Sequence, residues 1–135
     1  MKEGDELPAV KKLIDQDLIE AYAEASGDFN PIHIDHEYAA GSQFGGTIAH
    51  GMMIAAPISE MMTMAFPEDW PTSGRLKIRF RAPVRPGDIV TAFGQVKGIR
   101  RRPTSRQVVC SVGVRGGDGE AAITGDATVT IPVAP

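Results

Sequence analysis

The stretch AHGMMIAAPISEMMTMAF, residues 49–66, decides how the rest of this chain must be arranged. It is apolar nearly all the way round, and only four of its residues are clearly polar: His50, Ser59, Glu60 and Thr63. A helix with apolar side chains on every side is buried, so the remaining sequence must wrap around it. Pro57 lies inside the stretch and predicts either a kink or a delayed start of the helix.

The pattern changes to a period of two after this helix, as in a strand with one buried face. RLKIRFR, residues 75–81, alternates basic with apolar side chains, and the apolar ones are expected to face inward: Leu76, Ile78 and Phe80. The turn residues of APVRPGD end this strand. Three more strand-like runs follow, at roughly 88–99, 105–115 and 120–132, and the GGDG between the last two is typical of a hairpin. The predicted fold class is α+β, an antiparallel sheet around one buried helix.

The residues before the buried helix predict one short strand and one amphipathic helix. LPAVKKLI, residues 7–14, suits an edge strand because its proline cannot donate to a neighbouring strand. Asp15 is a typical N-cap, and Gly27 stands where a glycine ends a helix. Asp28 is therefore expected on the loop just beyond the helix end. A further helical turn is expected at residues 35–40.

Length and composition limit the possible functions. The 135 residues suffice for one domain, residues 1–135, with a core of its own. The longest apolar run, MMIAAPI, is far too short to span a membrane, and the acidic N-terminus lacks the apolar core of a signal peptide. Cys110 is the only cysteine, so no internal disulfide is expected. We therefore expect a cytoplasmic protein with no membrane partner.

Charge is distributed unevenly along the chain. Residues 1–70 hold 3 Lys/Arg against 13 Asp/Glu, whereas residues 71–135 hold 11 against 4. The basic half suits either a solvated sheet face or an acidic partner. The net charge of −3 and the lack of a recognition motif argue against a nucleic-acid partner.

The loop ASGDFNPIHID, residues 25–35, is the main candidate for a functional site, because loops on a rigid scaffold often carry binding and catalytic groups. Pro31 pushes Asn30 toward an extended conformation, so the segment is predicted to be a rigid corner and not a helix. Such a corner can aim Asp28 and His33 at one point. There, a carboxylate and an imidazole can position and activate a water near neutral pH.

Gly51 is predicted to open the buried helix. Its N–H lies at the positive helix end with no side chain above it, so it suits a carbonyl oxygen that gains negative charge. With these residues in place, ASGDFNPIHID followed by GTIAHGMM resembles the hydratase-2 motif of the MaoC-like dehydratases, the family of (R)-specific enoyl-CoA hydratases and (3R)-hydroxyacyl-thioester dehydratases. RFRAPVRPGD and the final AITGDATVTI extend the resemblance over nearly the whole chain.

The resemblance implies a hot-dog fold, in which an antiparallel sheet wraps a long central helix. It also implies a homodimer or larger homo-oligomer with acyl-thioester sites near subunit boundaries. By motif match, Asp28 and His33 fall on the catalytic Asp and His of the family. Gly51 falls on the residue whose N–H binds the thioester carbonyl, and Asn30 on the Asn that supports the loop. Ser59 matches a Ser found near the site in some relatives.

The function implied by the resemblance is the reversible hydration of trans-2-enoyl thioesters to (3R)-hydroxyacyl thioesters. No metal or redox cofactor is expected, because CoA or an acyl-carrier protein carries the substrate. A hot-dog acyl-thioesterase and a subunit of a heteromeric dehydratase are the alternatives. The pairing of Asp28 with His33 argues against the first, and the retention of Gly51 beside them argues against an inactive subunit.

Two further groups of residues leave alternatives open. His50 either caps the helix or orients the Asp28 loop, and it is also a candidate substrate-binding residue. Four arginines flank a predicted hairpin: Arg100, Arg101, Arg102 and Arg106. They are most simply a solvated turn, and the alternative is a clamp for CoA phosphates or an acidic carrier protein.

The histidines of the chain also raise the question of a metal site. His33, His36 and His50 fall within eighteen residues, alongside Asp28 and Asp35. Nitrogen and oxygen ligands of this kind suit zinc or a related ion. Their spacing matches no established metal motif, so no metal is predicted.

Overall fold

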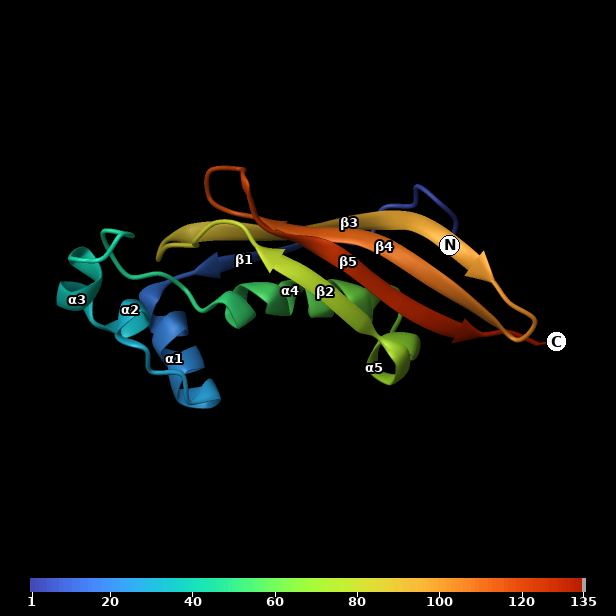
Figure 1. Ribbon diagram of the computed structural model, residues 1–135, viewed down its shortest axis with the longest axis horizontal. Helices are drawn as coiled ribbons and strands as arrows, with labels where there is room; N and C mark the ends of the chain where they lie inside the picture. Colours follow the sequence, from blue (N-terminus) through green and yellow to red (C-terminus); the bar gives the residue numbers. More distant parts are fainter. Residues whose placement is uncertain (135) are drawn as a thin grey trace.

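A five-stranded antiparallel sheet packs against one central helix in the computed structural model, which describes residues 1–134. The strands are β1 (Val10–Ile14), β2 (Arg75–Phe80), β3 (Asp88–Arg101), β4 (Ser105–Arg115) and β5 (Ala121–Pro132). The helices are α1 (Gln16–Ser26), α2 (Pro31–Ile34), α3 (His36–Ala40), α4 (Gly51–Ala65) and α5 (Asp69–Ser73). The strand order is β1-β3-β4-β5-β2. Figure 1 shows α4 along the sheet, with α1, α2 and α3 gathered at one end.

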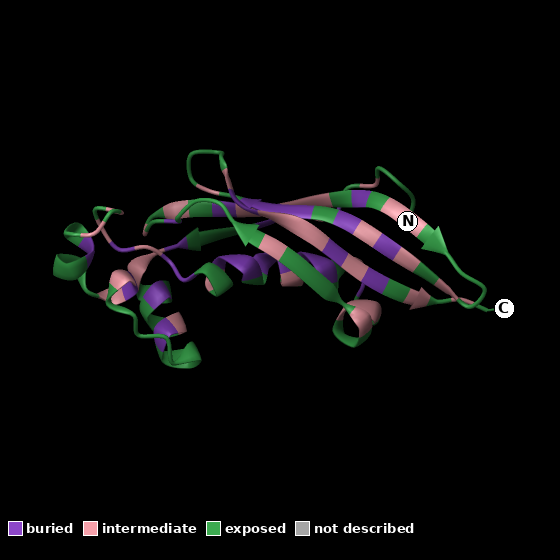
Figure 2. Cartoon of the chain, in the orientation of Figure 1, coloured by how far each residue is buried: buried purple, intermediate pink, exposed green. Residues whose placement is uncertain are grey.

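The core lies between α4 and the inner face of the sheet. Ile58, Met61 and Met62 of α4 are fully buried, as are Val90 of β3 and Cys110 of β4. Burying a side chain such as Ile or Met stabilises the fold by about 1.5–3 kcal/mol relative to leaving it exposed. Figure 2 shows the alternation of buried and exposed residues along the strands. The predicted α+β class, with an antiparallel sheet against one long helix, is confirmed. The helix is not buried on every side within this chain, because Met52 and Met64 are exposed.

The central helix begins at Gly51, as expected, and continues without interruption through Pro57 to Ala65. Of the two interpretations of Pro57, the delayed start is therefore wrong. None of the helices in residues 1–134 is long and apolar enough to cross a membrane.

Helix α1 begins and ends at the two residues that the sequence indicated. The Asp15 Oδ1 atom accepts a hydrogen bond of 2.9 Å from the Leu18 N–H, which satisfies one of the free donors at the helix start. Gly27 has a φ of 78°, a left-handed conformation that glycine adopts without strain. The chain turns sharply there, and Asp28 emerges on the loop beyond.

The prediction of a non-helical corner is wrong at residues 31–34, which form the single turn of α2. Pro31 occupies the first helical position, where its missing N–H costs nothing and its fixed φ favours the helix. The Asn30 Oδ1 atom accepts a hydrogen bond of 3.1 Å from the Ile32 N–H, so Asn30 is the N-cap. The segment is a rigid corner because its last part is a capped helical turn.

Strand β2 departs from the expected burial. Leu76 and Phe80 are 37% and 58% exposed, although they were predicted to lie in the core. The reason is the position of β2 at the sheet edge, where it pairs with β5 alone. Helix α4 packs mainly against the other four strands, so the inner face of β2 is only partly covered.

Candidate active site

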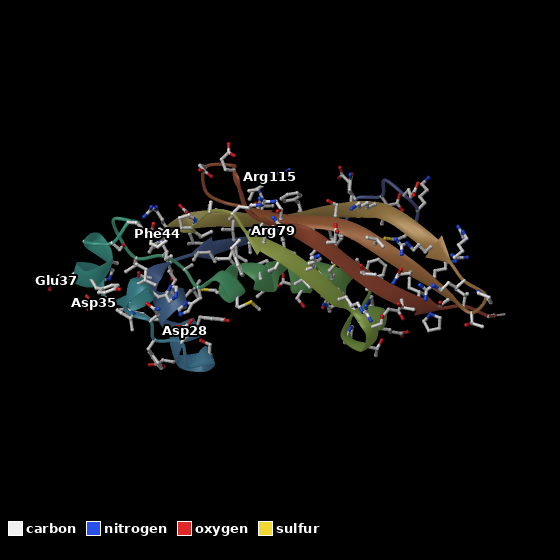
Figure 3. The ribbon with its side chains drawn as sticks, viewed as in Figure 1. Asp28, Asp35, Glu37, Phe44, Arg79 and Arg115 are labelled. Atoms are coloured by element: carbon white, nitrogen blue, oxygen red, sulfur yellow. The ribbon has the colours of Figure 1, made fainter. Side chains whose placement is uncertain are left out.

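A cavity of about 720 Å³ lies at the N-terminal end of α4. Its walls come from α1, α2, the start of α4 and the segment at residues 80–84. Four of the residues singled out from the sequence line it: Asp28, His33, His50 and Gly51. Figure 3 shows Asp28 at the helical end of the molecule, whereas Arg79 and Arg115 lie on the opposite side of the sheet. The structure therefore brings together residues that are up to 23 positions apart in the sequence.

Asp28 is held by its neighbours on the loop. Its N–H donates to the Ser26 Oγ atom at 3.2 Å, and its Oδ1 atom accepts from the Asn30 N–H at 3.2 Å. Asn30 thus supports the loop twice, through its amide and through its capping side chain. Asp28 is exposed, so its second carboxylate oxygen is accessible to a water or a ligand in the cavity.

His33 is presented by α2 and is 9% exposed. Its Nδ1 atom lies 2.8 Å from the Ile48 carbonyl oxygen, which can only accept, so we infer that Nδ1 carries the proton. The Nε2 atom then has a free lone pair and can accept a proton. The Gln16 side chain fixes the same turn, because its Nε2–H donates to the His33 carbonyl at 2.9 Å and its Oε1 atom accepts from the Thr47 hydroxyl at 2.8 Å.

His50 is 2% exposed and forms the inner wall of the site. Its Nε2 atom lies 2.9 Å from the Asp28 carbonyl oxygen. Its ring stacks on His33, with centroids 3.8 Å apart and planes 25° apart, and the Tyr22 ring lies 4.8 Å from it on a tilt. No hydrogen bond joins its side chain to the helix start. His50 thus occupies the N-cap position without capping the helix through its side chain, and the contact with Asp28 agrees with an orientation of the Asp28 loop.

A single metal ion does not fit this cluster. The ligand atoms of Asp28, His33 and His50 lie within 4.8 Å of one another. An imidazole binds a metal in the plane of its ring at about 2.0–2.1 Å. Two rings stacked face to face with nearly parallel planes cannot both point their lone pairs at one ion at that distance. His36 and Asp35, the other candidate ligands, lie outside the cavity on α3 and at its N-cap.

Gly51 is the first residue of α4, and its N–H belongs to the four helix amides that have no acceptor within the helix. The partial positive charge of the helix N-terminus adds to this donor. The Phe80 ring covers the glycine closely, because a Cβ atom at position 51 would lie 2.7 Å from a ring carbon. The lack of a side chain at position 51 therefore leaves the N–H open to a ligand and also leaves room for the Phe80 ring.

Ser59 is not brought to the cavity. It lies on α4 eight residues beyond Gly51, about 12 Å along the helix axis. Its Oγ atom accepts a hydrogen bond of 2.9 Å from the Trp70 indole N–H, so it ties α5 to α4. The four arginines for which a clamp was the alternative are exposed at the β3–β4 hairpin, which Figure 1 shows at the far end of the sheet from α1 and α2.

Several residues of the site carried no recognisable signal in the sequence. Tyr22 was not singled out from the sequence, and Arg81 was expected only as one of the basic residues that alternate with the apolar ones at residues 75–81, yet both line the cavity. The thiol of Cys110 was left without a role, and the structure places it in the core. Burial raises the pKa of this thiol to about 11, so it is neither accessible nor ionised as a nucleophile near neutral pH.

The fold and the site together define a hot-dog protein in which a carboxylate, an imidazole and a helix N-terminus face one cavity. Such a site can hold a water beside a polarised carbonyl. The chain belongs to the MaoC-like dehydratase family, whose model, described as MaoC like domain, matches residues 3–117.

Relatives of known activity cover most of the chain. It is 36% identical over 125 residues to a 3-hydroxybutyryl-CoA dehydratase of Methylorubrum extorquens, and the aligned region covers 91% of this chain and 76% of that protein. It is 34% identical over 134 residues to an (R)-specific enoyl-CoA hydratase of Rhodospirillum rubrum, covering 98% and 89%. The solved structure of an (R)-hydratase from A. caviae superposes with a TM-score of 0.84 at 28% identity and covers 98% of both chains.

Proposed function

We propose that this protein is a hydro-lyase that catalyses the reversible hydration of trans-2-enoyl thioesters to (3R)-hydroxyacyl thioesters. The observation that carries the proposal is the meeting of Asp28, His33 and the Gly51 N–H at one cavity. The named activities of the relatives, enoyl-CoA hydratase and 3-hydroxyacyl dehydratase, are the two directions of this reaction.

The reaction follows from the free atoms of the site. A water between the Asp28 carboxylate and the His33 Nε2 atom donates a hydrogen bond to each, which leaves an oxygen lone pair for attack on C3 of the enoyl group. The electrons of the double bond move to the thioester carbonyl oxygen, where the Gly51 N–H holds the enolate. The proton that the Asp–His pair takes from the water is then delivered to C2, which restores the carbonyl. Dehydration is the same sequence reversed.

The magnitudes are sufficient for a useful enzyme. General acid–base help of this kind contributes about 10²- to 10⁴-fold in rate, and a well-placed oxyanion donor about 10²- to 10³-fold. No step of this scheme needs a metal or a redox cofactor. Relatives include proteins named for CoA and for acyl-carrier-protein substrates, so we propose an acyl thioester of one of these carriers as the substrate.

A homodimer is the assembly that we propose. Strand β2 is an edge strand with an open row of backbone groups, and its inner face leaves Leu76 and Phe80 exposed. On α4, Met52 and Met64 are 61% and 57% exposed. A second copy paired along β2 would cover these side chains. We also propose a cytoplasmic location, which suits a single buried free thiol.

The test is the loss of the conjugated enoyl-thioester absorbance when the purified protein meets crotonyl-CoA, with free thiol assayed in parallel. Absorbance should fall without thiol release, and Asp28→Asn should lose most of the rate. Release of thiol would instead favour the thioesterase alternative. If neither signal moves, including with longer enoyl chains, the protein is not a hydratase by itself, and restoration by a second protein would indicate a heteromeric dehydratase.

A further inference from the structure

We infer that His50 is a positioning residue that fixes Asp28, His33 and Gly51 relative to one another. The inference rests on the proposed function. It concerns a residue that does not need to touch the substrate and acts through three contacts: a hydrogen bond to the Asp28 carbonyl, a stack against the His33 ring and a peptide bond to Gly51.

The hydrogen bond determines which nitrogen of His50 carries the proton. The Asp28 carbonyl oxygen can only accept, so the His50 Nε2 atom, 2.9 Å away, must donate. The Nδ1 atom is buried and has no hydrogen-bond partner among the described residues. The contact therefore places a proton on the Nε2 atom of His50, while its Nδ1 atom is enclosed by the protein.

The two stacked histidines consequently have complementary roles. Each ring donates one N–H to a backbone carbonyl, His33 to Ile48 and His50 to Asp28. The free lone pair of His33 is available to the reaction, whereas that of His50 is enclosed within the protein. When His33 accepts a proton from water, its ring is held against the His50 ring, with the two centroids 3.8 Å apart.

Asp28 has no other connection of this kind to α4. Its remaining hydrogen bonds go to Ser26, the last residue of α1, and to Asn30 on its own loop. The bond from His50 joins this loop to the residue directly before the oxyanion donor. Displacements of about 1 Å at a reacting group can cost about 10²-fold in rate. Loss of the hydrogen bond from His50 to Asp28 is therefore expected to lower kcat measurably.

Two substitutions separate the effect of the His50 hydrogen-bond donor from the effect of its stacked ring. In His50→Gln the side-chain amide nitrogen reaches nearly as far as Nε2, so it can still donate to the Asp28 carbonyl. In His50→Phe a ring still stacks on His33 but donates nothing. We expect His50→Phe to lower kcat about 10- to 100-fold with KM changed by less than about 3-fold, and His50→Gln to recover most of that loss. His36→Gln, on exposed α3, is the matched control and should retain full activity.

A double-mutant cycle identifies the group through which His50 acts. In an Asp28→Asn background, His50→Phe should cost less than about 3-fold, because the carboxylate that it positions is gone. An equal loss in both backgrounds, a loss confined to KM, or a His50→Gln as impaired as His50→Phe would overturn the inference. If His50→Phe fails to fold, His50→Asn, whose amide stops short of Asp28, takes its place against His50→Gln.

Nuclear magnetic resonance of the imidazole nitrogens tests the inference without any reliance on activity. At pH 8 the wild-type protein should show His50 protonated on Nε2 and His33 on Nδ1. A His50 protonated on Nδ1 cannot donate to Asp28 and would refute the positioning role even in an active enzyme. If the two protonation states are as expected and no enoyl thioester is hydrated, the proposed function is wrong while the geometry of His50 stands.

Discussion

Two places along α4, its N-terminus and the middle at Ser59, each hold a buried or half-buried pair of polar side chains, yet only the first is suited to chemistry. At the N-terminal end His50 stacks on His33 beside a cavity of about 720 Å³. At the middle of the helix the Ser59 Oγ atom accepts from the Trp70 indole N–H at 2.9 Å. The second pair joins two helices and lies outside that cavity. Hydrogen bonding of a polar group therefore does not by itself mark a site.

The difference lies in what each place leaves free. At the first place a His33 lone pair, an Asp28 carboxylate oxygen and the Gly51 N–H remain without obligatory partners and face the same space. A helix N-terminus also concentrates positive potential, whereas the C-terminal end of the same helix does the opposite. Reactivity follows from free donors and acceptors in an accessible space, and structural stability from satisfied ones.

The largest effect is expected from His33→Asn. An Asn side-chain amide can still donate to the Ile48 carbonyl as Nδ1–H does, so the corner is retained while the free Nε2 is lost. We expect kcat for enoyl-thioester hydration to fall about 10²- to 10⁴-fold, with the thermal unfolding midpoint little changed. An active His33→Asn enzyme would remove His33 from the mechanism and leave the N-terminal end of α4 without a base other than Asp28.

Gly51→Ala comes next, and it needs a second substitution to be interpretable. The added Cβ would lie 2.7 Å from the Phe80 ring, so lost activity has two possible causes, a screened N–H or a displaced ring. In a Phe80→Ala background the ring is absent. If the carbonyl site is the cause, Gly51→Ala should still cost about 10²-fold in kcat there. If the loss disappears, Gly51 is a packing residue and the oxyanion donor must be sought elsewhere.

Sequence reasoning predicted the elements that carry the site better than the contacts within it. The apolar profile on every side placed α4, the period of two placed β2, and the caps Asp15 and Gly27 placed Asp28 on its loop, because such signals are local. The sequence offered an orienting role for His50 toward the Asp28 loop as one of two alternatives. The stack on His33 and the choice of ring nitrogen were beyond reach, since no local pattern encodes which ring nitrogen meets which carbonyl. The exposure of Phe80 was missed for a related reason, because strand order decides which strand lies at an edge.

Arg81 should have a smaller effect, and on substrate binding. Its Nε–H donates to the Thr124 hydroxyl at 2.9 Å, which leaves the terminal nitrogens for an anion at the cavity. Exposed ion pairs are worth about 0.2–1 kcal/mol, so Arg81→Gln should raise KM for a CoA thioester by about 2- to 5-fold with kcat unchanged. A short thioester without phosphates is the control substrate and should show no change. Should Arg100→Gln have the larger effect on KM, the distant hairpin is the clamp.

The smallest catalytic effect is expected at Ser59, near the middle of α4. Ser59→Ala removes the acceptor of the Trp70 indole N–H, and an intramolecular hydrogen bond contributes about 0.5–1.5 kcal/mol to stability. We expect the free energy of unfolding to fall by about 1 kcal/mol in chemical denaturation, while kcat and KM stay at the wild-type values. A selective rise in KM for long acyl chains would contradict this division of α4, because an acyl chain would then have to reach Ser59, about two turns beyond Gly51 and outside the cavity. The comparison is sharpest when both variants are measured together, since His33→Asn should lose activity without stability and Ser59→Ala stability without activity.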